Sequence, residues 1–129
     1  MHSKPDIILY GRVPSKKNQR HVKWSRRKRH SVIVPSDNYL QWQEQATLQI
    51  LSQSCRKHSD AVAGIEMSFW LPDNIKTDLT NKAESVMDLL VDTEILKDDS
   101  WQYVPCVILT AEGIDREHPR VHIWIKERG

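Results

Sequence analysis

The chain has few of the residues that build the most easily recognised catalytic and metal sites. Among its 129 residues are two cysteines, six histidines and four glycines. The cysteines form no motif and the histidines show no zinc spacing, so we expect free thiols in a reducing compartment rather than a zinc site. No glycine-rich phosphate loop is present. No serine, cysteine or threonine stands in a recognisable nucleophile turn.

Long hydrophobic runs are also missing. No stretch approaches the roughly 18 apolar residues of a membrane span, and residues 1–6 are polar, which predicts neither a signal peptide nor a membrane partner. Hydrophobic residues make up 39% and charged residues 28% of the chain, as is typical of soluble globular proteins. We expect one domain over residues 1–129, located in the cytoplasm.

Acidic residues are absent from residue 7 to residue 36, although the formal net charge of the chain is only +2. Cationic side chains can neutralise phosphates, and Trp24 among them could stack on a base. The sequence therefore predicts a basic loop at about residues 15–30 that binds a polyanion, most simply a nucleic acid, and it leaves DNA and RNA both open. The predicted contacts are Lys16, Lys17, Asn18, Arg20, Lys23, Arg26, Arg27, Lys28 and Arg29.

Hydrophobic periodicity predicts the elements of an α/β (α+β) fold. Period-two or short β-branched runs indicate strands at residues 7–10, 31–35, 62–71, 103–110 and 121–125. Period 3.6 indicates helices at residues 39–51 and 79–90, the first with Ser36 as a plausible N-cap and the second with Ser85 on its polar face. This order predicts one small mixed sheet with two helices packed on it.

Acidic side chains flank the second predicted helix. Asp78 stands where the helix begins, and Asp98 and Asp99 follow its end. The two positions meet if the next strand folds back beside the start of the helix. Clustered carboxylates repel each other, so a site that holds them together usually contains a hard cation such as Mg²⁺ or Mn²⁺, which can activate a water. The polar face of the same helix carries Asn81, Glu84 and Asp88 as further candidate ligands.

Each acidic residue also has a purely structural interpretation. Asp78 could cap the helix, Asp98 and Asp99 could form a turn, and Glu84 could lie on a solvated face. Spacing alone leaves these interpretations open.

Several segments together resemble the RusA-type Holliday junction resolvases. The similarity covers roughly residues 10–103. It is carried by the segments Gly11–Asn18, Val34–Ser36 with Tyr39 and Trp42, Thr77–Lys82, Met87–Leu90 and Ile95–Asp99. The resemblance implies a homodimer of phage or prophage type that cuts four-way DNA junctions with Mg²⁺ or Mn²⁺, in a bacterial or phage-infected cell. It further implies that Asp78 and Asp99 are catalytic metal ligands with Asp98 beside them, and that Asn81 matches the family's asparagine.

Two positions depart from the family pattern. Thr80 stands where the family has a second aspartate, and Glu84 stands where it has a lysine. We expect Glu84, one helical turn from Thr80, to supply the missing carboxylate, and Lys82, one turn after Asp78, to supply the missing cation. Two alternatives remain: a non-enzymatic binder of branched DNA with a degenerate metal site, and an RNA-processing or RNA-binding module.

Overall fold

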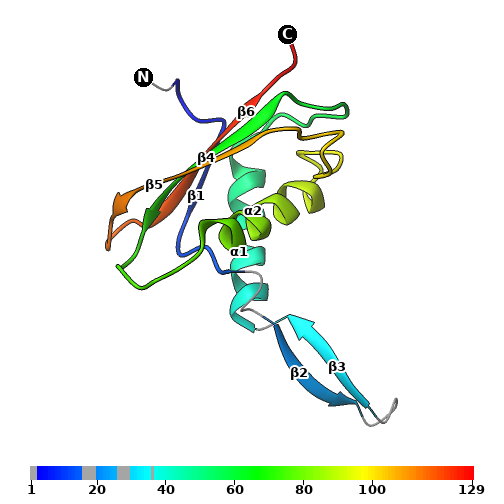
Figure 1. Cartoon of the computed structure of the whole chain (residues 1–129), viewed down its shortest axis with the longest axis vertical. Coiled ribbons are helices and arrows are strands. Elements are labelled where there is room, and N and C mark those ends of the chain that lie inside the picture. The colour runs from blue at the N-terminus through cyan, green and yellow to red at the C-terminus, as the bar shows by residue number, and fades with distance from the viewer. Residues whose placement is uncertain (1–2, 16–19, 26–29, 36) are drawn as a thin grey trace.

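The computed structural model describes residues 3–15, 20–25, 30–35 and 37–129, with the backbone alone for 20–25 and 30–35. It contains a four-stranded mixed sheet in the order β1-β6-β4-β5. The strands are β1 (Ile7–Tyr10), β4 (Gly64–Leu71), β5 (Val107–Ile114) and β6 (Arg120–Lys126). β4 runs parallel to β5, whereas β6 runs antiparallel to both β1 and β4. Two helices, α1 (Asp37–Ser52) and α2 (Leu79–Asp92), pack on the sheet (Figure 1), which confirms the predicted α+β fold.

A separate two-stranded hairpin carries part of the predicted basic loop, the basic segment at about residues 15–30. β2 (Arg20–Ser25) pairs antiparallel with β3 (His30–Pro35), and Figure 1 shows the hairpin extending away from the sheet and helices. The strand at residues 31–35 was predicted. β2 was not, because a strand that gains its hydrogen bonds from one partner away from the core needs no hydrophobic alternation.

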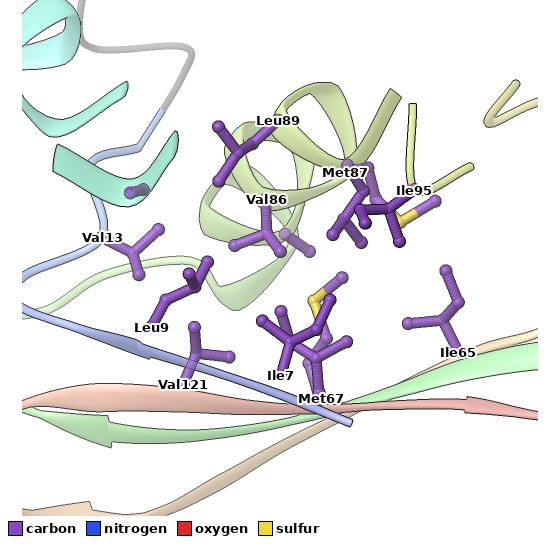
Figure 2. Packing of buried hydrophobic residues seen from close by; sticks show 14 of the residues in the cluster. Ile7, Leu9, Val13, Ile65, Met67, Val86, Met87, Leu89, Ile95 and Val121 are labelled. Atoms are coloured by element: carbon purple, nitrogen blue, oxygen red, sulfur yellow. The ribbon is translucent and has the colours of Figure 1, made fainter. Parts of the chain in front are cut away.

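The core lies between the helices and one face of the sheet. Ile65, Met67 and Phe69 alternate along β4 toward the helices and are almost fully buried. Val86 of α2 is equally buried and faces the sheet from the helix side (Figure 2). Each buried side chain of this size contributes about 1.5–3 kcal/mol relative to leaving it exposed. This core fixes the position of α2, the helix that Asp78 precedes.

The opposite face of β4 is also covered, although period-two alternation, as predicted for residues 62–71, is typical of a strand with only one buried face. Glu66 is only 7% exposed and Ser68 only 1%. Ser68 Oγ donates to Glu112 Oε1 at 3.0 Å, and the Arg120 guanidinium lies 4.2 Å from the centre of the Trp70 ring. Polar residues tolerate burial here because β5 and β6 flank β4 and supply hydrogen-bonding partners.

Two other local expectations are corrected. The fourth predicted strand was placed at residues 103–110, whereas β5 spans Val107–Ile114. Residues 103 and 104 instead donate their backbone N–H groups to Ser100 O at 3.0 and 2.8 Å, so a turn occupies the start of the predicted run. Ser85 was expected on the polar face of its helix, but it is fully buried. Ser36, the predicted N-cap, lies outside the described residues.

The free edge of β1 is covered by two glutamine side chains, Gln49 of α1 and Gln53 directly after its last residue. Gln53 Oε1 accepts from the N–H of Ile8 at 2.9 Å, and Gln53 Nε2 donates to the carbonyl of Ile8 at 2.6 Å. Gln49 makes the same two bonds with Tyr10, at 2.7 and 3.2 Å. The two side chains therefore take the place of a further strand at this edge.

None of the helices in the described part of the chain is long and apolar enough to cross a membrane.

Candidate functional site

The basic segment is joined to the body of the protein through contacts with α2. Lys82 Nζ donates to the carbonyl of Val13, and Ser85 Oγ donates to the carbonyl of Pro14 at 2.7 Å. Both donors are buried side chains on one face of the helix. These contacts fix residues 13 and 14 directly before the segment that carries most of the cations.

Lys82 does not present its ammonium group to solvent, because it is only 7% exposed. Desolvation lowers the pKa of Lys82, and the nearby Arg12 guanidinium lowers it further, whereas Asp73 opposes the shift. The ammonium of Lys82 therefore already binds the carbonyl of Val13, and its role as the missing cation stays a prediction.

A cavity of about 270 Å³ lies between the end of β4, residues 12–15 and the start of α2. Arg12, Asp73, Lys76 and Lys82 line it, and Arg12 forms an ion pair with Asp73. The sequence contained no signal for the Arg12–Asp73 pair, since the two residues are 61 positions apart and the fold alone brings them together. The cavity is therefore lined by charged side chains of both signs.

Asp78 lies at a second, adjoining cavity of about 210 Å³, lined by Ser15, Lys76, Thr77, Asp78 and Asn81. Asp78 occupies the N-cap position of α2, yet its side chain makes no capping hydrogen bond. It is exposed, and Asn81 Nδ2 donates to Asp78 Oδ2 at 3.4 Å. Its carboxylate is thus not used to cap the helix, and the 3.4 Å contact is long for an N–H···O bond.

Asp98 and Asp99 lie at the other end of α2. Leu96 N donates to Leu90 O at 3.1 Å, and Ile95 and Leu96 are buried, so the loop is held close to the C-terminal end of the helix. Asp98 accepts hydrogen bonds from Ser100 Oγ at 2.9 Å and from its neighbour's backbone N–H at 2.8 Å. The Ser100 bond, helped by the backbone bond, lowers the pKa of Asp98. Asp99 is exposed.

One chain therefore does not bring Asp78 together with Asp98 and Asp99. α2 contains 14 residues, which makes it about 20 Å long, and it separates the two positions. The sequence reasoning assumed that the next strand folds back beside the helix start. Instead β5 begins beside Ile65 at the start of β4 and ends beside Leu71, so the loop that precedes β5 lies at the end of the sheet away from Asp78. No group of three or more acidic, histidine or cysteine side chains suited to a metal ion occurs among the described residues.

The remaining candidate ligands lie on the outer surface of α2. Glu84 and Thr80 are exposed, and Asn81 and Asp88 are half-buried. The exposure of Glu84 leaves its proposed role open as a prediction.

The cationic candidates divide into two groups. Arg20 and Lys23 lie on β2, opposite Pro35 and Val32 of β3. The predicted contacts Lys16, Lys17, Asn18, Arg26, Arg27, Lys28 and Arg29 lie outside the described residues.

An exposed tryptophan near the acidic loop was missed by the sequence reasoning. Trp101 follows Asp99 by two positions and is 74% exposed. An isolated aromatic residue in a polar loop was the only available signal, and it is a weak one.

A comparison with known protein families identifies the family of the chain. The family model described as endodeoxyribonuclease RusA matches residues 12–126. The chain belongs to the RusA endodeoxyribonuclease family. The match includes the basic segment, α2, both acidic positions and all of the sheet except β1. RusA proteins act on branched DNA junctions. A search of curated proteins found no match to this chain.

Proposed function

We propose that this RusA-family protein is a crossover junction endodeoxyribonuclease that uses Mg²⁺ or Mn²⁺ and works as a homodimer. The observation that carries the proposal is the exposed carboxylate of Asp78, which is not used in helix capping and lies at a cavity beside Lys76. A purely structural role for Asp78 would favour a capping hydrogen bond that is not made.

The donor set fits a hard divalent ion. Asp78, Asp98, Asp99 and Glu84 offer carboxylate oxygens, which Mg²⁺ and Mn²⁺ prefer over nitrogen and sulfur. When bound, such an ion would supply a more acidic water and offset negative charge on the phosphodiester that is cut. The residues that would hold it are Asp78 and Asp99, with Asp98 positioned by Ser100.

A second copy of the chain completes this set. The length of α2 separates Asp78 from Asp99 within one chain, so a site containing both requires Asp78 from one copy and the partner's Asp99. A C2 dimer contains two such sites, and this symmetry matches the approximate two-fold symmetry of a four-way junction.

The other residues of the site bind and orient the DNA. Lys76 adds positive charge at the cavity of Asp78, Arg12 lines the adjoining cavity, and the basic segment continues from residues 13–15. Each phosphate that the segment neutralises steepens the salt dependence of binding by about 0.9 in log–log slope. Cation contacts of this kind position the backbone without reading the bases.

The first experiment compares cleavage of a synthetic four-way DNA junction with cleavage of a matched linear duplex, in Mg²⁺, Mn²⁺ or EDTA. We expect paired cuts near the branch that are lost in EDTA and in Asp78→Asn, while junction binding is retained. Tight binding without cuts in any metal would instead support a non-enzymatic junction binder. Thr80 favours that alternative, because it lacks the carboxylate of the family pattern. Preference for RNA over junction DNA at equal salt would contradict both.

A mixing experiment tests the shared site. Asp78→Asn and Asp99→Asn are each expected to be inactive alone. In a heterodimer of the two, one site carries both substitutions and the other carries neither, so mixing restores about one quarter of all sites. The control mixes Asp78→Asn with the double variant Asp78→Asn/Asp99→Asn, in which every site is altered. If the first mixture is as inactive as the control, the site is not shared between copies.

A further inference from the structure

The two edges of the sheet differ in whether their backbone hydrogen-bonding groups are covered. Gln49 and Gln53 cover the edge of β1 through hydrogen bonds to the backbone of residues 8 and 10. At the other edge, no described strand pairs with the outer side of β5. An uncovered edge strand is a template for pairing with another chain, and proteins usually protect it.

The backbone groups at this open edge can be assigned from the pairing with β4. Ile65 N donates to Cys106 O at 2.9 Å, so Cys106 directs its carbonyl toward β4. Because the direction of the backbone N–H and C=O groups alternates from one residue to the next along a strand, these groups of residues 108 and 110 also point toward β4. The N–H and C=O groups of Val107, Leu109 and Ala111 therefore point away from the sheet, up to the irregularity that follows.

The side chains of the same segment are apolar and incompletely covered. Val107 is 43% exposed and Ile108 is 42% exposed. Val107, Leu109 and Ala111 are in register with the core residues of β4 and so share the helix-covered face of the sheet, yet the first and third are exposed and Leu109 is only half-buried. The hydrophobic core of one chain thus extends to β5, where its apolar side chains are left partly exposed to solvent.

We propose that β5 pairs antiparallel with β5 of a second copy, in a register centred on Leu109. This inference rests on the proposed homodimeric function and names its interface. The register places Leu109 opposite its own copy and Val107 opposite the partner's Ala111. All three outward-facing residues of each strand then face one another as hydrogen-bonded pairs.

The segment carries no charge that would oppose pairing with its own copy. Residues 107–111 have the sequence VILTA, so no charged side chain faces another across the pairing. Glu112, the first charged residue, falls opposite Cys106, outside this segment. Pairing of this kind is isologous, with the same surface used by both copies.

The same arrangement brings the separated acidic residues to one end. Antiparallel strands in one sheet are related by a two-fold axis perpendicular to the sheet, so both α2 helices lie on the same face and run antiparallel. The N-terminal end of one α2 then lies on the same side of the dimer as the C-terminal end of the other. Asp78 and the partner's Asp99 are thereby placed at the same end, as the shared site requires. Insertion of an extended peptide at β5 would satisfy the edge but would not bring a second acidic loop.

Cysteine cross-linking tests the register. In a Cys55→Ser/Cys106→Ser background, Leu109→Cys is expected to form a disulfide across the two-fold axis. Directly opposite residues of a hydrogen-bonded pair lie about 5.5 Å apart between Cα atoms, within the range that a disulfide spans. Ala111→Cys is the matched control, since it is offset from its own copy by four residues, about 13 Å. After mild oxidation, the first variant should migrate at twice the 15.1 kDa chain mass and the second at the single mass.

Sedimentation of the wild-type protein and of two lysine variants supplies an independent readout. Leu109→Lys places two like charges opposite each other at the axis and should convert the dimer to a monomer. Thr110→Lys adds the same charge on the other face, where the two copies are diagonal neighbours offset by two residues, about 7 Å along the strand, so it should weaken the dimer less than Leu109→Lys does. A wild-type monomer at the concentrations that cut DNA, a dimeric Leu109→Lys, or equal cross-linking of the two cysteine variants would each overturn the β5 interface.

These failures are distinguishable from failure of the proposed function. Paired junction cuts together with a failed cross-link would place the dimer interface elsewhere and leave the nuclease intact. A specific cross-link without cuts would retain the interface and remove the nuclease.

Discussion

The contact between Ser85 and Pro14 provides a direct test of how α2 holds the start of the basic segment. Ser85 is fully buried, and its Oγ donates to the Pro14 carbonyl at 2.7 Å. Pro14 is itself buried, so water does not readily replace the lost donor. Ser85→Ala removes the donor while adding no bulk.

The expected magnitude follows from the burial of both partners. A buried carbonyl left without its hydrogen bond costs about 1–3 kcal/mol. We expect Ser85→Ala to lower the free energy of unfolding by about 2 kcal/mol. With a urea m-value of about 1.5 kcal/mol/M, the midpoint of unfolding should fall by roughly 1.3 M.

Urea denaturation followed by tryptophan fluorescence and circular dichroism measures this change. Glu84→Ala is the matched control, because Glu84 is the preceding residue of the same helix and is exposed. Its effect should stay within about 0.5 kcal/mol. If Ser85→Ala also stays within that range, the hydrogen bond does not stabilise the junction between α2 and the segment, and the reasoning is refuted.

Two further predictions concern the sheet. Replacing both Gln49 and Gln53 with alanine removes four hydrogen bonds at the β1 edge and should lower the free energy of unfolding by only about 2 kcal/mol, because water replaces part of each bond. Concentration-dependent aggregation, measured by light scattering, should increase as well. An unchanged free energy of unfolding and unchanged solubility would show that the glutamines do not protect the edge. For His122, burial lowers the pKa below its ordinary value of about 6.5, and Arg120 lowers it further. The unfolded chain therefore binds more protons as the pH falls below 6.5, and the folded state loses stability until the folded pKa is passed. Unfolding of His122→Gln should show a smaller loss between pH 7 and pH 5, and an identical pH profile would contradict this assignment.

Much of the fold was predictable from local periodicity. The helix at 79–90 was predicted because residues such as Ala83, Val86 and Leu90 recur at helical spacing, and α2 extends this segment by only two residues. The last strand was predicted because Val121 and Ile123 alternate with polar residues, and both are fully buried in β6. Patterns of this kind are visible in sequence because a buried face imposes its own period on the chain.

Burial that depends on hydrogen-bonding partners was not predictable in the same way. Lys82 and Ser85 are polar, so the period placed neither in the core, yet backbone carbonyls of residues 13 and 14 bind them in the interior. Glu66 and Ser68 are buried for the same reason, since residues of neighbouring strands satisfy them. A sequence does not reveal which distant group will satisfy a polar side chain.

The sequence by itself determined the α+β class, the acid-free basic segment, the two acidic positions that flank one helix and, through its motifs, membership of the RusA family. Each of these depends on local order or on residue type. Only the tertiary structure decided that those acidic positions lie at opposite ends of α2, that Arg12 meets Asp73, and that one sheet edge is covered while the other is open. The reason is physical: separation along the chain does not specify separation in space until the parallel pairing of β4 and β5 sets the direction of the helix between them.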